Sequence, residues 1–296
     1  MLYVLTSAAV IVLVLGFSAH LASGCATVPL LPAAADAPRL VVLTYNVNFG
    51  LEGDEAALEA IAAADADLVL LQETTPVWSQ VLRERLGALY PHIAEVQRPA
   101  AGGQMVLAKQ PFEVRETIPS PVKWFPALRL VAQTALGPVQ VLNLHLHPPV
   151  SPSGSWVSGY FTTGPVRREE VQAFTRGLEP GLPTILAGDF NEEARGDAIA
   201  FLKEGGARDA VSDHLGSAPT WRWPVGALTL RFQLDHVLYQ GGLRPVDVQV
   251  LERGHSDHLP VKVTFVRDES PFAAAGSAAR LISPKCSSLR RSGSRG

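Results

Sequence analysis

Apolar and polar positions along residues 39–268 form blocks of strand length and helix length. Leu40–Asn46 (LVVLTYN) is apolar until it ends in polar residues, as is typical of a strand buried on both faces. Thr75-Pro76 has the chemistry of a helix start, with Thr as cap and Pro in the first turn. The same pattern predicts further strands at 67–71, 105–108, 128–133, 139–145, 184–187, 235–239, 246–251 and 261–266, and helices at 55–64, 76–86 and 166–176. Connections of both hairpin and helix length indicate mixed sheets with outer helices.

The two ends of the chain have different patterns. Residues 2–23 are apolar on every helical face, which predicts a signal peptide or membrane anchor over residues 1–25. The four residues from Ala22 to Cys25 also resemble a bacterial lipobox, in which the cysteine is lipidated. Residues 26–38 are rich in Ala and Pro and predict a linker, and residues 269–296 predict a disordered basic tail. We therefore expect an extracytoplasmic protein, either membrane-anchored or secreted.

Charge and cysteine content limit the possible functions. The net charge is −3, and the last 28 residues hold five basic residues against Glu269 alone, which leaves −7 for residues 1–268. Such a domain has no overall attraction for nucleic acid, although a local basic groove stays possible. Cys25 and Cys286 are the only cysteines and lie outside the predicted domain. The sequence therefore predicts neither a disulfide framework nor a cysteine zinc site there.

Polar residues recur at or near the ends of the predicted strands. Asn46, Glu73, His145, Asp189 and Asp257 all follow this rule or nearly so. Strand ends meet at one edge of an α/β sheet, and loops at that edge carry active sites. We therefore expect these side chains, which are far apart in the sequence, to share one site.

Two short motifs carry candidate chemistry. In Gly188-Asp189-Phe190-Asn191 the carboxylate can orient or deprotonate a water, and the Asn191 amide can donate to a developing oxyanion. The same four residues also suit an ordinary turn. In Ser256-Asp257-His258, the acid suits a hard cation and the imidazole suits a base or phosphate contact. A surface Asp-His pair is the alternative.

Three further residues are placed where an unpartnered polar group would be costly. Asp235 lies within a predicted strand and needs a partner, which could be a catalytic histidine or a nearby arginine. Glu73 ends a buried strand and must be solvated, paired or metal-bound. His145 also ends a strand, where a lone histidine is more often structural.

Taken together, these segments resemble the endonuclease/exonuclease/phosphatase superfamily, which has the DNase I-like fold. The resemblance covers residues 39–267 in order: TYNV, LQE, GGQMVLAK, NLHL, GDFN, PTW, QLDHVL and SDHLP. Each motif alone is weakly specific, but eight in order at natural spacing are not. The resemblance implies an α/β (α+β) fold for residues 39–268, a four-layer sandwich of two mixed β-sheets flanked by helices.

The resemblance also implies roles for individual residues. Asn46 and Glu73 would hold Mg²⁺ or Mn²⁺, and Asp257 would join the metal or phosphate shell. Asp189 would activate the attacking water, and Asn191 would stabilise the transition state. The remaining roles are phosphate contact for His145, orientation of His258 by Asp235, and bracing by Arg167 or Arg168. His236, where Tyr is frequent in the family, and His147 depart from the pattern.

The predicted function is metal-dependent hydrolysis of a phosphoester, most plausibly a phosphodiester, by a monomer. The substrate would be nucleic acid or a phospholipid headgroup. GxSxG and HExxH motifs are absent, so competing hydrolase chemistries lack their parts. The alternative is a catalytically inactive phosphate- or lipid-binding lipoprotein on the same scaffold. Five aromatic residues in loop-like segments could enter a membrane, stack on bases or anchor loops: Trp124, Phe125, Trp156, Tyr160 and Phe161.

Overall fold

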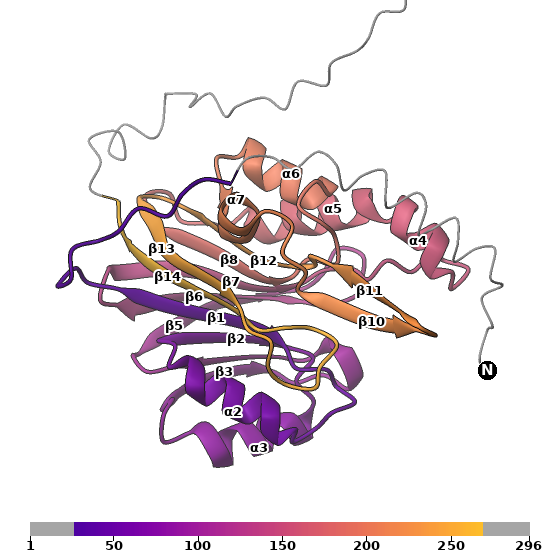
Figure 1. Ribbon diagram of the computed structural model, residues 1–296, viewed down its shortest axis with the longest axis horizontal. Helices are drawn as coiled ribbons and strands as arrows, with labels where there is room; N and C mark the ends of the chain where they lie inside the picture. The colour runs from indigo at the N-terminus through magenta and orange to yellow at the C-terminus, as the bar shows by residue number, and fades with distance from the viewer. Residues whose placement is uncertain (1–26, 269–296) are drawn as a thin grey trace, which may run out of the picture.

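Two six-stranded sheets pack face to face, with helices on the outside (Figure 1). The computed structural model describes residues 27–268. The predicted leader over 1–25, with its lipobox at Cys25, and the predicted tail over 269–296 lie outside the described residues. Within residues 27–268, no helix is both long and apolar enough to cross a membrane. Residues 27–39 contain no helix or strand, but the Val28 N–H donates to the Asp213 carbonyl at 2.7 Å.

The first sheet has the strand order β13-β14-β1-β2-β4-β3. Neighbouring strands are antiparallel except β1 and β2, which are parallel. Two helices, α2 (Glu55–Ala64) and α3 (Pro76–Leu86), cover its outer face, and side chains of Asp54 and Thr75 cap them. The strands are β1 (Leu40–Asn46), β2 (Leu68–Gln72), β3 (His92–Val96), β4 (Gln104–Ala108), β13 (Leu243–Val250) and β14 (Val261–Arg267).

The second sheet has the order β5-β6-β7-β8-β12-β9, and β7 and β8 are its parallel pair. Its outer face packs against α5 (Gly164–Thr175) and α6 (Asp197–Glu204), through Val171, Phe174 and Ile199. The strands are β5 (Phe112–Ile118), β6 (Ala127–Thr134), β7 (Gly137–His145), β8 (Thr184–Asp189), β9 (Arg208–Asp209) and β12 (Asp235–Gln240).

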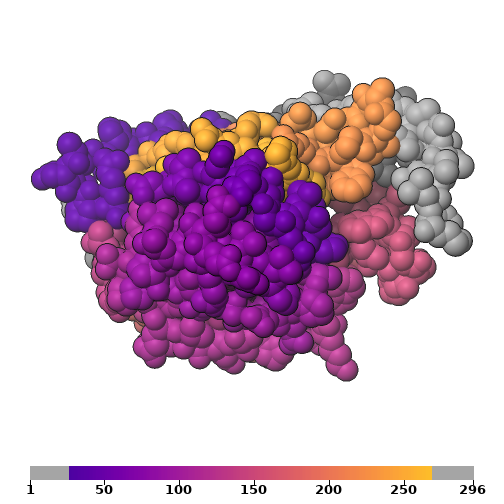
Figure 2. All heavy atoms as spheres, turned by 90° about the horizontal axis from the view of Figure 1, so that it is seen from below, coloured from indigo at the N-terminus to yellow at the C-terminus, as the bar shows by residue number. Residues whose placement is uncertain are grey.

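Four smaller elements complete the described chain. A 3₁₀ turn, η1 (Ala100–Gly102), precedes β4, and α7 (Ala210–Leu215) adds two residues to the core between the sheets. Helix α4 (Trp156–Thr162) and the hairpin of β10 (Trp221–Val225) and β11 (Leu228–Phe232) stand out from the body on the same side (Figure 2).

The core explains the continuous apolar runs of the central strands. Alternate residues of β1 face the second sheet (Val42) or the outer helices (Leu43), so both faces are buried. Leu70 and Val141 meet between the sheets in the same way. The predicted four-layer sandwich of two mixed β-sheets is therefore confirmed.

Some element predictions were incomplete. The helix expected at 166–176 starts earlier, at Gly164, and the strand expected at 246–251 starts at Leu243. Edge strand β5 was not predicted because most of its residues are exposed, so it lacks an apolar run. Strands β3 and β9, the β10–β11 hairpin and helices α4, α6 and α7 were also missed.

A buried polar bridge joins the central strands of the two sheets. The Gln72 amide on β2 donates to Asn143 Oδ1 on β7 at 2.6 Å, and Asn143 Nδ2 donates to the Leu71 carbonyl at 2.9 Å. Gln72 also donates to Thr44 Oγ1 at 3.1 Å. Buried amides must find partners, so these bonds favour one alignment of the sheets over others.

We expect Asn143→Leu to lower the free energy of unfolding by about 2–3 kcal/mol, because it leaves the buried Gln72 amide and Leu71 carbonyl short of partners. Urea denaturation measures the loss. The exposed Gln133 on the neighbouring strand is the control, and Gln133→Leu should change stability by less than about 0.5 kcal/mol. Equal stability of the two variants would show that the bridge contributes nothing.

Candidate active site

Asp189, the last residue of β8, lies at the centre of the polar cluster. Its Oδ2 is 3.2 Å from Asn46 Nδ2, 3.6 Å from His145 Nε2 and 3.5 Å from His258 Nε2. Its Oδ1 accepts the Asn191 N–H at 2.9 Å. The side chain is buried, and burial raises the pKa of this carboxyl despite the two histidines. A carboxylate with increased proton affinity suits a general base.

Strand register explains why these residues meet. In the second sheet Asp189 pairs with His145 on parallel β7 and with Asp235 on antiparallel β12. Two strands therefore end, and a third begins, at the same edge. Gly188 is required just before Asp189: its φ is +146°, and a Cβ there would lie 1.9 Å from the Leu144 carbonyl oxygen.

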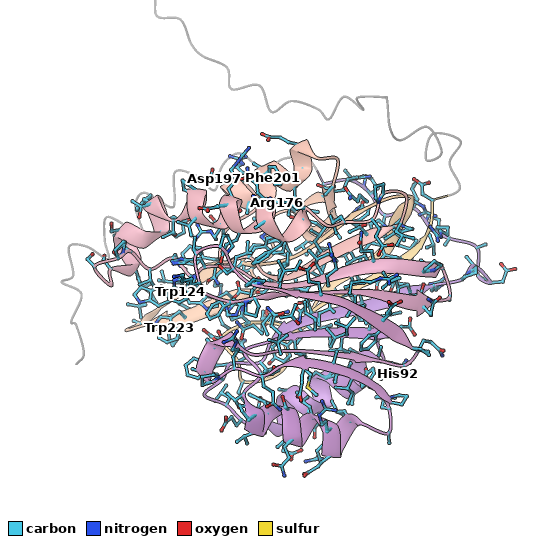
Figure 3. The ribbon with its side chains drawn as sticks, turned by 180° about the vertical axis from the view of Figure 1, so that it is seen from behind. His92, Trp124, Arg176, Asp197, Phe201 and Trp223 are labelled. Atoms are coloured by element: carbon cyan, nitrogen blue, oxygen red, sulfur yellow. The ribbon has the colours of Figure 1, made fainter. Side chains whose placement is uncertain are left out.

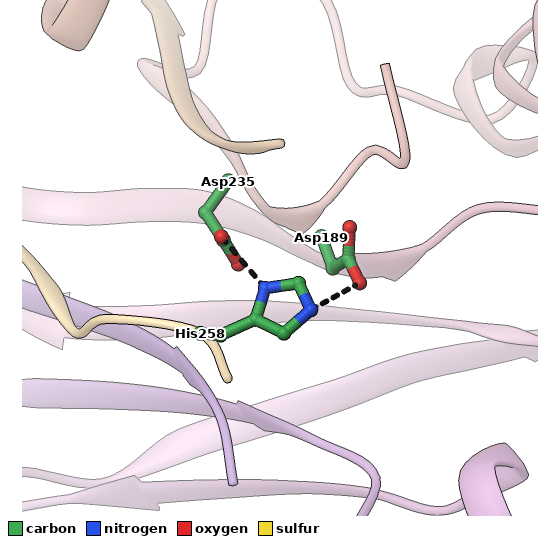
Figure 4. Close-up of side chains that lie close together, drawn as sticks. All are labelled: Asp189, Asp235 and His258. Carbon is green, nitrogen blue, oxygen red and sulfur yellow. Dashed lines mark hydrogen bonds and ion pairs between the residues drawn. The ribbon is translucent and has the colours of Figure 1, made fainter. Parts of the chain in front are cut away.

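His258 is held between two carboxylates (Figure 4). Its Nδ1 donates to Asp235 Oδ2 at 2.8 Å, and its Nε2 faces Asp189. Burial lowers the pKa of His258, but Asp235 and Asp189 outweigh that effect and raise it to about 10. His258 is therefore an imidazolium at neutral pH. Thr220 Oγ1 accepts the N–H of Asp235 at 2.9 Å and so fixes the start of β12.

His145, on the other side of Asp189, differs from His258 in charge state. Its ring stacks on Phe125 with centroids 4.0 Å apart, and it is buried. Burial lowers the pKa of His145 to about 4, because Asp189 does not compensate fully and His258 repels a second cation. The neutral ring can hydrogen-bond to a phosphate but cannot neutralise it. Phe125, one of the five aromatic residues considered as membrane contacts, base contacts or loop anchors, is buried and supports this ring.

Glu73 forms the acidic corner of the site. It follows β2 with a φ of +62°, an unusual conformation for a residue other than Gly that is often found at functional sites. Its Oε1 accepts from Asn46 Nδ2 at 3.0 Å and its Oε2 from the Phe49 N–H at 3.1 Å. Burial raises the pKa of Glu73, and among residues 27–268 no Lys or Arg forms an ion pair with it.

Asp257 lies in the loop between β13 and β14, shortly before the last strand. Its Oδ1 accepts from Asn48 Nδ2 and its Oδ2 from Trp221 Nε1, both at 2.9 Å. The adjacent residues Asn48 and Phe49 donate to Asp257 and Glu73 respectively, which links the two carboxylates. Asn48 and Trp221 were not predicted, although Asn48 directly follows the TYNV motif and PTW contains Trp221.

Two groups of residues could hold a divalent cation. Asp189, Asp235 and His258 each offer a ligand atom within 4.8 Å of the others. However, both ring nitrogens of His258 already face carboxylates, Nδ1 bonding to Asp235 at 2.8 Å and Nε2 lying 3.5 Å from Asp189. Glu73, with Asn46 and Asp257 near it, offers oxygen ligands, and no Lys or Arg among residues 27–268 forms an ion pair with it. These three residues, which form the acidic corner of the site and the proposed metal corner, fit Mg²⁺ or Mn²⁺ better.

The sequence profile of the endonuclease/exonuclease/phosphatase family matches residues 43–258. The chain belongs to this family. Its members are phosphoesterase hydrolases. No curated protein matches the chain at a meaningful level of similarity.

Solved structures of this family share the fold of the chain. An endonuclease/exonuclease/phosphatase from Beutenbergia cavernae DSM 12333 has a TM-score of 0.62 at 21% identity and covers 78% of this chain and 72% of its own. A humanized D. rerio TDP2 has a TM-score of 0.60 at 20% identity, and the match covers 77% of this chain and 98% of the TDP2 chain. ANGEL2, a 2',3'-cyclic phosphatase, has a TM-score of 0.60 at 15% identity, and the match covers 82% of this chain and 100% of the ANGEL2 chain.

In this member of the endonuclease/exonuclease/phosphatase family, one arginine braces the loops that follow β7 and β8. Arg167 is buried, and its Nε donates to Glu192 Oε2 at 3.0 Å, next to Asn191. Its guanidinium also donates to the His147 carbonyl at 3.3 Å. Asn191 has a φ of +52° and donates from Nδ2 to the Leu146 carbonyl at 2.9 Å. Arg167 therefore supports the loop that carries Asn191.

Two other residues considered from the sequence lie apart from Asp189. Arg168 is directed to the surface, where it pairs with Glu204 at 3.3 Å. His236 is buried and bonds Asp209 Oδ2 at 2.8 Å and the Glu192 carbonyl at 3.0 Å. His236 therefore supports the second sheet through the Asp209 pair.

Glu170 of α5 secures the backbone just beyond His145. Its Oε2 accepts the His147 N–H at 2.7 Å, and its Oε1 accepts from Ser120 Oγ at 2.8 Å. Burial raises the pKa of Glu170 from its ordinary 4.5 to about 7, against the lowering effects of these bonds and of Arg167. Between these two pKa values, the folded protein keeps a proton on this carboxyl that the unfolded chain releases.

Stability should therefore fall as pH rises from 5 to 8, since the folded state binds the extra proton over that interval. Glu170→Gln removes this contribution while keeping an acceptor and a donor. We expect the wild type to lose about 2–3 kcal/mol more than the variant between pH 5 and pH 8. Urea midpoints at the two pH values measure it, and parallel curves would contradict the raised pKa.

Proposed function

We propose that this protein is a divalent-metal-dependent phosphodiesterase. The observation that carries the proposal is the position of the buried Asp189 carboxylate. It lies between the imidazolium of His258 and the Asn46–Glu73 pair, within 3.5 Å of the first and 3.2 Å of the Asn46 amide. A base, a cation and an acidic metal corner are thus grouped where one phosphate can meet all three.

Asp189 accepts a proton from the attacking water as the new P–O bond forms, and its raised pKa favours that step. The ester P–O bond then breaks, and the departing oxygen takes up a proton from solvent or from a neighbouring donor. His258 Nε2–H donates to a phosphate oxygen and offsets its charge. Asn191 has a second amide proton for the same purpose, because only one is used for the Leu146 carbonyl.

Glu73 and Asn46, with Asp257, would hold Mg²⁺ or Mn²⁺, which when bound supplies positive charge to the phosphate oxygens. The support from the structure is the chemistry of Glu73, a largely buried carboxylate with two neutral donors and no Lys or Arg partner in the described chain. Asp257 is held in place by Asn48 and Trp221.

Nucleic acid and lipid headgroups both contain the bond that this site would cleave. One D. rerio TDP2 structure holds a single-strand DNA product, and ANGEL2 is a 2',3'-cyclic phosphatase, so both belong in a substrate panel. We also propose that the protein works outside the cytoplasm as a monomer, either secreted or tethered through its N-terminus. The apolar run over residues 2–23 supports this location.

Asp189→Asn should lower kcat for bis-p-nitrophenyl phosphate about 10³-fold, because an amide cannot accept the proton of water. Asp197→Asn is the matched control. Asp197 is an exposed residue of α6 on the outer face (Figure 3), and its substitution should leave kcat within about twofold. Similar kcat values for both variants would exclude Asp189 as the base.

Metal removal gives a second test. EDTA should abolish turnover and Mg²⁺ should restore it, whereas Glu73→Gln should raise the Mg²⁺ concentration for half-maximal activity about 10–100-fold. Full activity in EDTA would contradict the proposal. Absence of turnover on DNA, RNA, sphingomyelin and bis-p-nitrophenyl phosphate would favour the inactive phosphate- or lipid-binding alternative.

A further inference from the structure

The β10–β11 hairpin has one apolar face and one polar face. Its register pairs Trp221 with Phe232, Trp223 with Leu230 and Val225 with Leu228, and side chains paired in this way point to the same side. Arg222 pairs with Arg231, and Pro224 with Thr229, on the opposite side. The hairpin is therefore amphipathic, although it stands out from the body and belongs to neither large sheet.

The polar face forms one wall of a pocket beside the proposed metal corner. The pocket has a volume of about 560 Å³, and its lining includes Asn48, His255 and Asp257 together with Arg222, Arg231 and Trp223 of the hairpin. Asp257 also accepts from Trp221 Nε1 of the same hairpin. The pocket therefore adjoins Asp257, one of the proposed metal ligands.

The apolar face is covered by α4 only in part. The ring centroids of Phe232 and Tyr160 of α4 are 6.0 Å apart, and Trp221 stacks on Phe232 with ring centroids 5.6 Å apart. Beyond these contacts Trp223 is 50% and Leu228 52% exposed. On α4, Trp156 is 62% and Phe161 74% exposed. We call Trp156, Phe161, Trp223 and Leu228 the apolar rim.

The apolar rim lies on one side of the molecule. Helix α4 and the hairpin project together in two perpendicular views (Figures 1 and 2), and Trp124 and Trp223 are at the same end (Figure 3). Trp124 is exposed and packs on Phe125, which supports His145. Exposed aromatic residues grouped on projecting elements indicate an interaction surface.

Charge decides between the two partners that aromatic residues suit. Residues 148–165, which include α4, contain no charged residue, and neither do residues 223–230 at the hairpin tip. Residues 27–268 as a whole carry 20 basic and 27 acidic residues, a formal charge of −7. A polyanionic strand needs cations along its path, whereas the interface of a bilayer accepts uncharged segments rich in Trp and Phe.

We propose that the apolar rim inserts into the interface of a lipid bilayer and presents the pocket to phosphodiesters of lipid headgroups. The substrate assignment rests on the proposed phosphodiesterase activity, whereas the insertion does not. The apolar run over residues 2–23 supports it independently, because a second membrane contact on the same chain would keep the site at the surface.

The test uses the full chain in vesicles of phosphatidylcholine and sphingomyelin with brominated acyl chains, which quench Trp fluorescence at short range. Every variant keeps its N-terminus and all tryptophans. Phe161→Asp/Leu228→Asp charges the apolar rim, and Val77→Asp/Leu89→Asp adds the same charge to exposed apolar positions near α3. Thermal melting confirms that both fold.

We expect the rim variant to lose at least about half of the quenching and to hydrolyse vesicle lipid about tenfold more slowly or worse. Its turnover of soluble bis-p-nitrophenyl phosphate should stay within about twofold, and the control pair should match the wild type in all three measurements.

Insertion would be overturned if the rim variant kept the quenching of the wild type. If that variant also lost binding of a single-stranded oligonucleotide, the apolar rim would be a base-stacking surface. If neither substrate is hydrolysed by the wild type, the proposed activity fails, while quenching still decides whether the apolar rim enters lipid.

Discussion

Contact between the two sheets through buried polar groups is the constraint on which the site depends. Gln72 and Asn143 bridge the sheets through amide bonds, and at the strand ends Asn46 of one sheet donates to Asp189 of the other at 3.2 Å. Each buried amide or carboxylate would be costly without its partner, so the sheets are held at one alignment. That alignment brings Glu73, carried by the first sheet, to the Asp189 cluster of the second.

Burial affects the charge of two histidines differently. His145 and His258 both lie within 3.6 Å of Asp189, but only His258 has a second carboxylate, Asp235, at 2.8 Å. Desolvation therefore prevails at His145 and lowers its pKa to about 4, whereas two carboxylates prevail at His258 and raise its pKa to about 10. The site thus holds one cation and one neutral ring around a single base.

Much of this arrangement could be predicted because local patterns carry it. The continuous apolar run of β1 indicated a strand buried on both faces, and Thr75-Pro76 marked the start of α3. Asn46, Glu73 and Asp189 stood out because a polar side chain at the end of a buried strand needs a bonding partner. Asn48 and Trp221 could not be found in this way, since their role is a bond to Asp257, which lies far from both along the chain.

By itself the sequence indicated mixed sheets with outer helices, the family and the candidate polar residues, because apolar periodicity and short motifs can be read along the chain. Only the tertiary structure decided which histidine is charged, that Phe125 is buried against His145, and that the β10–β11 hairpin turns one apolar face outward beside α4. Those features depend on desolvation and on contacts between distant segments, and such quantities exist only once the chain has folded.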